Sequence, residues 1–223
     1  MEVRRPFVNF ILKRILDLIC KIDCKEYVDA LSQNKPLLVI FNHINFLEVP
    51  ILVTHSYPVN VTGMVKSETW KNPFMSFLCN TYKAVPIDRS GAFTESFHKV
   101  NEAIKNGFFM CVSPEGTRSK NGILQKGKAG IVHLALDANV PILPVVHHGG
   151  ERVWQNIRRL RRTPFYFKVG RPFCIKYDGR PGREEREKIM SEVMGQMARL
   201  LPEQMRGIYS GNLQNECKYL DFI

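Results

Sequence analysis

The stretch Leu37-Leu38-Val39-Ile40-Phe41-Asn42-His43 decides how this chain is organised. Five consecutive apolar residues end abruptly in two polar ones, a pattern typical of a β-strand that is buried on both faces. Similar apolar runs recur at 59–65, 108–112, 142–146 and 165–169, and helical periodicity separates or follows them at 48–55, 93–105, 128–138 and 183–200. This alternation predicts an α/β fold with a single domain, a mixed β-sheet and flanking helices.

The segment 7–22 predicts an N-terminal amphipathic helix. Polar residues interrupt it too often for a membrane-spanning helix or an ordinary signal peptide. One face of this helix would carry Phe7, Phe10, Ile11, Arg14, Ile15, Leu18 and Ile22. Two readings stay open, because such a face can pack on the core or lie in a membrane interface. We expect an N-terminal membrane-associating segment at 1–34, the globular domain at 35–202, and a tail at 203–223 that is either a surface strap or a frayed end.

The chain is basic, with 32 Lys and Arg against 21 Asp and Glu, which gives a net charge of +11. This excess favours anionic partners such as nucleic acid, phosphorylated ligands or an anionic membrane surface. No helix-turn-helix or aromatic-and-basic recognition motif occurs, so nucleic acid is not expected as a partner. The six cysteines are scattered without a Cys-x-x-Cys pair, which indicates reduced thiols and no metal site.

Basic residues concentrate near the middle of the chain's second half. The cluster consists of Arg152, Arg158, Arg159, Arg161 and Arg162, interleaved with Trp154, Ile157 and Leu160. It is either a solvated face or a contact for anionic headgroups or for the phosphates of a ligand. Just before it, His147 and His148 are interpreted as packing residues at a strand end.

The first predicted strand delivers His43 at its exit, the place where α/β sheets meet ligands. Glu48 follows five residues later. A neutral imidazole can accept a proton from a hydroxyl, and a carboxylate on its other nitrogen fixes the tautomer and stabilises the imidazolium. His43 and Glu48 can therefore form a catalytic dyad, although a His and an acid at this spacing also occur by chance.

Two further strand ends carry arginines. The run 108–112 breaks into Ser113-Pro114-Glu115-Gly116-Thr117-Arg118-Ser119, and Val85-Pro86-Ile87-Asp88 leads to Arg89. The first turn can gather backbone N–H groups and Arg118 around a phosphate, or be an ordinary turn. Arg89 can act likewise, or form a surface ion pair with Asp88.

Taken in order, these sites resemble the glycerolipid acyltransferase superfamily of PlsC-like proteins, which includes the 1-acylglycerol-3-phosphate acyltransferases. The family's first block, Asn-His followed by four residues and an acid, is matched at 42–48, and its second, an apolar stretch ending in Arg, at 87–89. The third, Pro-Glu-Gly-Thr-Arg-Ser, is complete at 114–119, and the fourth, an apolar strand with two prolines, is matched at 140–145. Smaller similarities lie at Lys66 and at Lys126-Gly127, so the resemblance covers about 37–146. The acid of the first block is usually Asp and here is Glu48.

The resemblance implies a PlsC-like acyltransferase domain that moves a fatty acyl group from a thioester of coenzyme A or acyl carrier protein directly to a lysophospholipid hydroxyl. The acceptor it implies is 1-acylglycerol-3-phosphate, which would give phosphatidic acid. His43 would be the general base and Glu48 would orient it. Acceptor and phosphate would be bound by Asn42, Lys66, Arg89, Glu115, Gly116, Thr117 and Arg118.

No protein nucleophile is required in this reaction, in keeping with the lack of a Gly-x-Ser-x-Gly elbow in the sequence. We expect no tightly bound cofactor and a peripheral or monotopic location at the cytoplasmic face of a membrane, with its anionic surface as a partner. Two alternatives remain: a same-fold acyltransferase for another lysolipid or an amino-acid-derived acceptor, and a non-catalytic lipid-binding member of the family.

Overall fold

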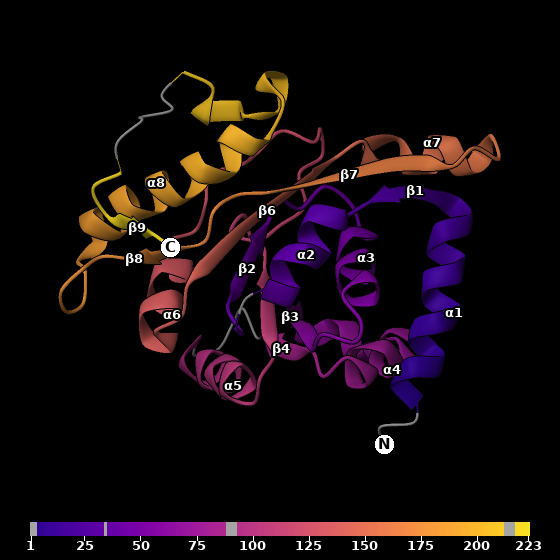
Figure 1. Cartoon of the computed structure of the whole chain (residues 1–223), viewed down its shortest axis with the longest axis horizontal. Coiled ribbons are helices and arrows are strands. Elements are labelled where there is room, and N and C mark those ends of the chain that lie inside the picture. Colours follow the sequence, from indigo (N-terminus) through magenta and orange to yellow (C-terminus); the bar gives the residue numbers. More distant parts are fainter. Residues whose placement is uncertain (1–3, 34, 88–92, 212–216) are drawn as a thin grey trace.

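The fold is built on one nine-stranded sheet, seen in a computed structural model that describes residues 4–33, 35–87, 93–211 and 217–223 (Figure 1). The strands follow the order β1 (Cys20–Asp23), β7 (Thr163–Val169), β6 (Ile142–His148), β2 (Leu38–Phe41), β5 (Phe109–Val112), β3 (Val61–Lys66) and β4 (Val85–Ile87). Two short strands, β8 (Phe173–Ile175) and β9 (Leu220–Phe222), extend the sheet beside β6. The strands β2 to β6 are parallel, whereas β7 and β8 are antiparallel to β6, so the prediction of a mixed sheet is confirmed.

Helices cover both faces of this sheet (Figure 1). Leu38 and Ile40 of β2 point into one apolar core with α5 (Phe93–Lys105), α6 (Gly130–Ala138) and α8 (Arg183–Leu200). Val39 and Phe41 point into the other core with α1 (Arg4–Ile19), α2 (Lys25–Gln33) and α3 (Glu48–His55). Because each side of the strand loses contact with water, both sides stabilise the folded state, by about 25 cal/mol per Å² of buried apolar area. This explains why the run is apolar at every position rather than at alternate ones.

Apart from the N-terminal helix, the predicted strands and helices are present, with boundaries that differ by at most two residues. The prediction missed the helices α2, α4 (Pro73–Thr81) and α7 (Val153–Arg158) and the strands β1, β4, β8 and β9, together with the 3-10 turns Ser67–Lys71, Gly150–Arg152, Glu203–Met205 and Gly207–Tyr209. All of these elements have nine residues or fewer. Helix α4 nevertheless has clear start signals, since the Asn72 side chain accepts a hydrogen bond from the Met75 amide and Pro73 occupies the first turn.

The predicted helix at 7–22 is wrong at its end. Helix α1 stops at Ile19, and Cys20 begins strand β1, which pairs with β7. The Arg162 guanidinium donates two hydrogen bonds to the Cys20 carbonyl, at 3.1 and 2.7 Å. Local periodicity could not reveal this change because the pairing partner lies about 140 residues further along the chain.

The apolar face predicted for α1 points outward. Phe7, Phe10, Ile11, Ile15 and Leu18 are between 40% and 75% exposed. The opposite side of the helix packs on the domain through buried Leu16 and Asn9, whose amide donates to the Thr54 carbonyl at 3.1 Å and whose oxygen accepts from the Tyr82 hydroxyl at 3.0 Å. Packing on the core thus uses one face of α1 and leaves the more apolar one free. Across the described residues, no helix is both long and apolar enough to cross a membrane.

The C-terminal segment also joins the domain. Strand β9 pairs with β8, and the Leu124 amide donates to the Met205 carbonyl at 2.8 Å. The Gly127 amide donates to the Tyr209 hydroxyl at 3.3 Å. Residues near the end of the chain therefore hold the loop that follows the Pro-Glu-Gly-Thr-Arg-Ser turn, and both the segment 1–34 and the segment 203–223 contribute a strand to the sheet.

Candidate active site

The carboxyl ends of the parallel strands bring the predicted site residues to one edge of the sheet. His43 lies just beyond β2, the turn with Glu115 and Arg118 follows β5, and Lys66 ends β3. Strand β4 ends at Ile87, two residues before Arg89, which lies outside the described residues. The edge that the sequence predicts for the site is thus the edge at which these strands end.

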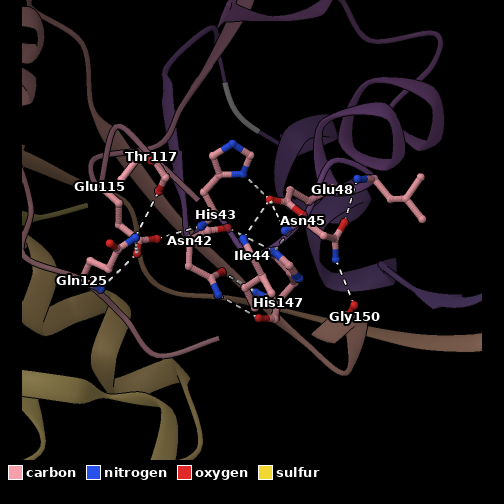
Figure 2. A network of polar contacts seen from close by, with 11 residues as sticks. Asn42, His43, Ile44, Asn45, Glu48, Glu115, Thr117, Gln125, His147 and Gly150 are labelled. Atoms are coloured by element: carbon pink, nitrogen blue, oxygen red, sulfur yellow. Dashed lines mark hydrogen bonds and ion pairs between the residues drawn. The ribbon is translucent and has the colours of Figure 1, made fainter. Parts of the chain in front are cut away.

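His43 and Glu48 form a direct pair (Figure 2). The Glu48 carboxylate contacts Nδ1 of His43, and a neutral imidazole can make this hydrogen bond only if Nδ1 carries the proton. Nε2 is then an unprotonated base. The Glu48 side chain is fully buried, whereas the His43 side chain is 25% exposed. The pair therefore presents a basic nitrogen to ligands while hiding the carboxylate that orients it.

The position of Glu48 in the first turn of α3 stabilises its charge. The amides of Ile44 and Asn45 donate to the two carboxylate oxygens, each at 3.0 Å. Burial without such donors would disfavour the ionised form, whereas these amides of the loop before α3 favour it, as does the positive end of the helix dipole. The extra methylene of Glu relative to Asp is thus accommodated, because the carboxylate reaches back to the imidazole and to these amides together.

The structure gives Glu115 and Asn42 roles that differ from the expected acceptor binding. Glu115 is buried, accepting from the His43 amide at 2.7 Å through one oxygen and from the Gln125 amide at 3.0 Å through the other. Burial raises the pKa of Glu115, and these hydrogen bonds offset part of the effect. The Asn42 side chain exchanges two hydrogen bonds with the backbone of His147, at 2.8 and 2.9 Å. Both side chains brace the loop around His43 and have little capacity left for a ligand.

Three predicted binding residues, Lys66, Thr117 and Arg118, are exposed at this edge. Gly116 adopts a left-handed conformation with φ of 65°, and a Cβ there would lie 2.8 Å from Nζ of Lys128. The Ser119 amide donates to the His43 carbonyl at 2.7 Å, which fixes the turn beside the dyad. A guanidinium and an ammonium therefore flank the same turn, an arrangement suited to a phosphate.

The fold brings to this site four residues that the sequence analysis did not assign to it. Lys128 lies over Gly116, and His147 lies 3.6 Å from Glu48. Phe46, inside the loop that joins the dyad, stacks on Trp154 of α7 with ring centroids 5.1 Å apart, and both rings are largely exposed. The sequence could not reveal the contact between Phe46 and Trp154, because the two residues are 108 positions apart. It indicated only that Phe46 lies within the first block and Trp154 within the arginine cluster.

The cysteines offer no activated thiolate. All six are unpaired, and burial raises the pKa of each thiol, reaching about 12 for Cys111 of β5. A thiolate nucleophile needs the opposite shift. Within the described ranges, no three His, Cys, Asp or Glu residues are grouped so that they could hold a metal ion.

The chain is similar to proteins of lipid synthesis. The family model described as Acyltransferase matches residues 22–148. Two relatives called 1-acyl-sn-glycerol-3-phosphate acyltransferase are 33% identical over 149 residues, from Cocos nucifera, and 30% identical over 139 residues, from Limnanthes douglasii. These alignments cover 65% and 60% of this chain but 47% and 49% of the relatives, so the chain spans about half their length.

A solved structure is similar over most of the chain. The crystal structure of the 1-acyl-sn-glycerophosphate acyltransferase PlsC from Thermotoga maritima matches with a TM-score of 0.62 and 24% sequence identity. The match covers 89% of this chain and 80% of that one. It supports the α/β fold described above.

Proposed function

This chain belongs to the acyltransferase family, and on that premise we propose that it transfers a fatty acyl group from an acyl thioester to the hydroxyl of a lysophospholipid, with 1-acylglycerol-3-phosphate as acceptor. The observation that carries the proposal is the His43 imidazole, paired with a buried carboxylate and bonded through its carbonyl to the turn that carries the exposed Arg118. The relatives named above bear the name of this reaction.

The proposed step needs no covalent enzyme intermediate. Nε2 of His43 accepts the proton of the acceptor hydroxyl as the oxygen attacks the thioester carbonyl. A C–O bond forms, the C–S bond breaks, and the proton passes from the imidazolium to the leaving thiolate. Glu48 stabilises the imidazolium, and Arg118, with Lys128 against Gly116 of the same turn, binds the phosphate of the acceptor. Coenzyme A and acyl carrier protein both present a phosphate-bearing thioester, which suits the basic character of the chain.

Thiol release tests this function. Purified protein is incubated with an acyl-coenzyme A or an acyl-acyl carrier protein, with and without lysophosphatidic acid, and the free thiol and lipid product are measured. We expect release that depends on the acceptor and yields phosphatidic acid. A panel of other lysolipids and amino-acid-derived acceptors identifies a different acceptor, whereas lipid binding without thiol release would indicate a non-catalytic member.

We also propose peripheral binding at the cytoplasmic face of an anionic membrane. The outward face of α1 supplies apolar area, and exposed Arg152, Arg158, Arg159 and Arg161 supply charge. Arg162 is not available for this purpose, because its guanidinium is bound to the Cys20 carbonyl. The six unpaired cysteines are in keeping with a reducing compartment.

Replacing Arg159 and Arg161 together with Gln is expected to weaken binding to phosphatidylserine vesicles by up to about 30-fold, at about 1 kcal/mol per basic residue near the surface. The loss should shrink at high salt, because screening already weakens these contacts. Co-sedimentation with vesicles measures the effect.

The matched control is the pair Lys99→Gln and Lys188→Gln, which removes the same charge from exposed positions on α5 and α8. Equal losses of vesicle binding in the two double variants would show that the arginine cluster acts only through the net charge of the protein. Salt-insensitive binding that survives polar replacement of Phe10 and Ile15 would exclude both proposed contacts.

A further inference from the structure

His147 lies in the interior of the site rather than at its surface. It occupies strand β6 with its side chain fully buried. Its ring stacks on Phe165 of β7, with ring centroids 5.8 Å apart, and lies tilted against Phe167 of the same strand, with centroids 5.5 Å apart. Packing accounts for these two contacts but not for what the ring nitrogens do.

The polar contacts of His147 define its protonation. Nε2 lies 3.0 Å from the carbonyl oxygen of Asn42, the residue before the proposed base. A carbonyl oxygen can only accept, so Nε2 must carry the proton. Nδ1 is buried and has no hydrogen-bond partner among the described residues. A neutral ring fits this environment, and burial lowers the pKa of His147.

The same nitrogen lies near the carboxylate that contacts His43. Nε2 of His147 is 3.6 Å from the Glu48 oxygen that is not bonded to His43 (Figure 2). Glu48 therefore lies between two imidazoles that have different exposure. His43 is partly open to ligands, whereas His147 is closed off behind it.

We propose that His147 is a positioning residue for the acyl transfer, whose Nε2–H fixes the Asn42 carbonyl and holds the Glu48 carboxylate in the orientation that aligns His43. This inference rests on the proposed function. Two constraints act together: Asn42 is tied to His147 by its side chain and its carbonyl, and the peptide that follows Asn42 carries His43. Without the N–H, the Asn42 carbonyl would lose a buried donor, and the Glu48 carboxylate would lose the polar group 3.6 Å from its second oxygen.

Two replacements separate the N–H from the ring. His147→Phe keeps an aromatic ring against Phe165 and Phe167 but has no donor. His147→Gln lacks the ring, but its amide nitrogen can occupy a position similar to Nε2 and donate to the Asn42 carbonyl. The matched control is His148→Phe, since His148 is the next residue of β6 and its ring stacks on Tyr166, 5.2 Å away between centroids.

In the thiol-release assay, His147→Phe is expected to lower kcat by about tenfold or more, because a small misplacement of the base is costly, while KM for donor and acceptor stays nearly unchanged. His147→Gln should recover most of the loss, and His148→Phe should match the wild-type protein. Wild-type kcat in His147→Phe, equal impairment of the Phe and Gln variants, or a change confined to KM would each overturn the proposal.

A second readout does not need turnover. The proton between His43 and Glu48 should give a downfield NMR signal, assigned by its loss in His43→Ala. We expect the signal to persist in His147→Gln and His148→Phe and to broaden or disappear in His147→Phe; an unchanged signal there would contradict positioning. Inactive wild-type protein that shows this pattern would refute the proposed function but not the positioning role. If neither His147→Phe nor His147→Leu folds while His147→Gln does, the hydrogen bond serves the fold, and the proposal is overturned.

Discussion

Replacing His43 with Ala is expected to lower kcat by about 10²- to 10⁴-fold, because the proposed general base is lost. Glu48→Gln should lose nearly as much, since a neutral amide no longer stabilises the imidazolium. The double variant should have a kcat only slightly below that of the worse single variant, because the effects of residues that act as one catalytic unit are not additive. Glu48→Asp should lie between Glu48→Gln and the wild-type protein, as the shorter side chain keeps the charge.

The burial of each residue determines how its replacement should affect the thermal stability of the protein. A site residue near the surface would leave the fold unaffected, but Glu48 is fully buried and holds the amides of Ile44 and Asn45. We therefore expect Glu48→Gln to melt at a lower temperature than the wild-type protein, whereas His43→Ala, at a partly exposed ring, should melt close to it.

Rates must be compared at a temperature at which all the variants are folded. His148→Ala is the matched control for removal of an imidazole at the same edge. Full activity in a well-folded His43→Ala protein would refute the proposed mechanism. Strictly additive losses in the double variant would instead show that the two residues act separately.

Replacing Arg118 with Ala is expected to raise KM for lysophosphatidic acid by about 10- to 100-fold, the range for loss of a hydrogen bond between charged groups. The side chain is exposed on the turn that is bonded to His43. KM for the thioester should change less. Arg118→Lys should recover only part of the loss, because an ammonium lacks the planar fork of a guanidinium.

The control for Arg118→Ala is Lys120→Ala, which removes the same charge from an exposed position two residues along the turn. A monoacylglycerol acceptor supplies the second comparison, because it presents the hydroxyl without a phosphate. Steady-state kinetics with both acceptors measure the effect. Equal losses toward acceptors with and without phosphate would contradict a phosphate-binding role for Arg118.

Much of the site could be predicted because its signals are local. The dyad lies within six consecutive residues, from His43 to Glu48, and the turn with Arg118 follows an apolar strand directly. Parallel strands in turn place their carboxyl ends at one edge of the sheet. The roles of Glu115 and Asn42 could not be predicted in this way, because each depends on a partner that is distant in the sequence, His43 for Glu115 and His147 for Asn42.

By itself, the sequence determined the α/β alternation, the strands buried on both faces, the edge that carries His43, and the apolar face of α1. Each of these is encoded by the spacing of neighbouring residues, and the spacing follows from the geometry of helices and strands. Only the tertiary structure decided that the α1 face points outward, that Cys20 leaves the helix for the sheet, and that His147 stands behind Glu48. These outcomes depend on pairs of residues about 40 to 140 positions apart, such as Asn9 with Thr54 and Cys20 with Arg162, which meet only when the sheet has assembled.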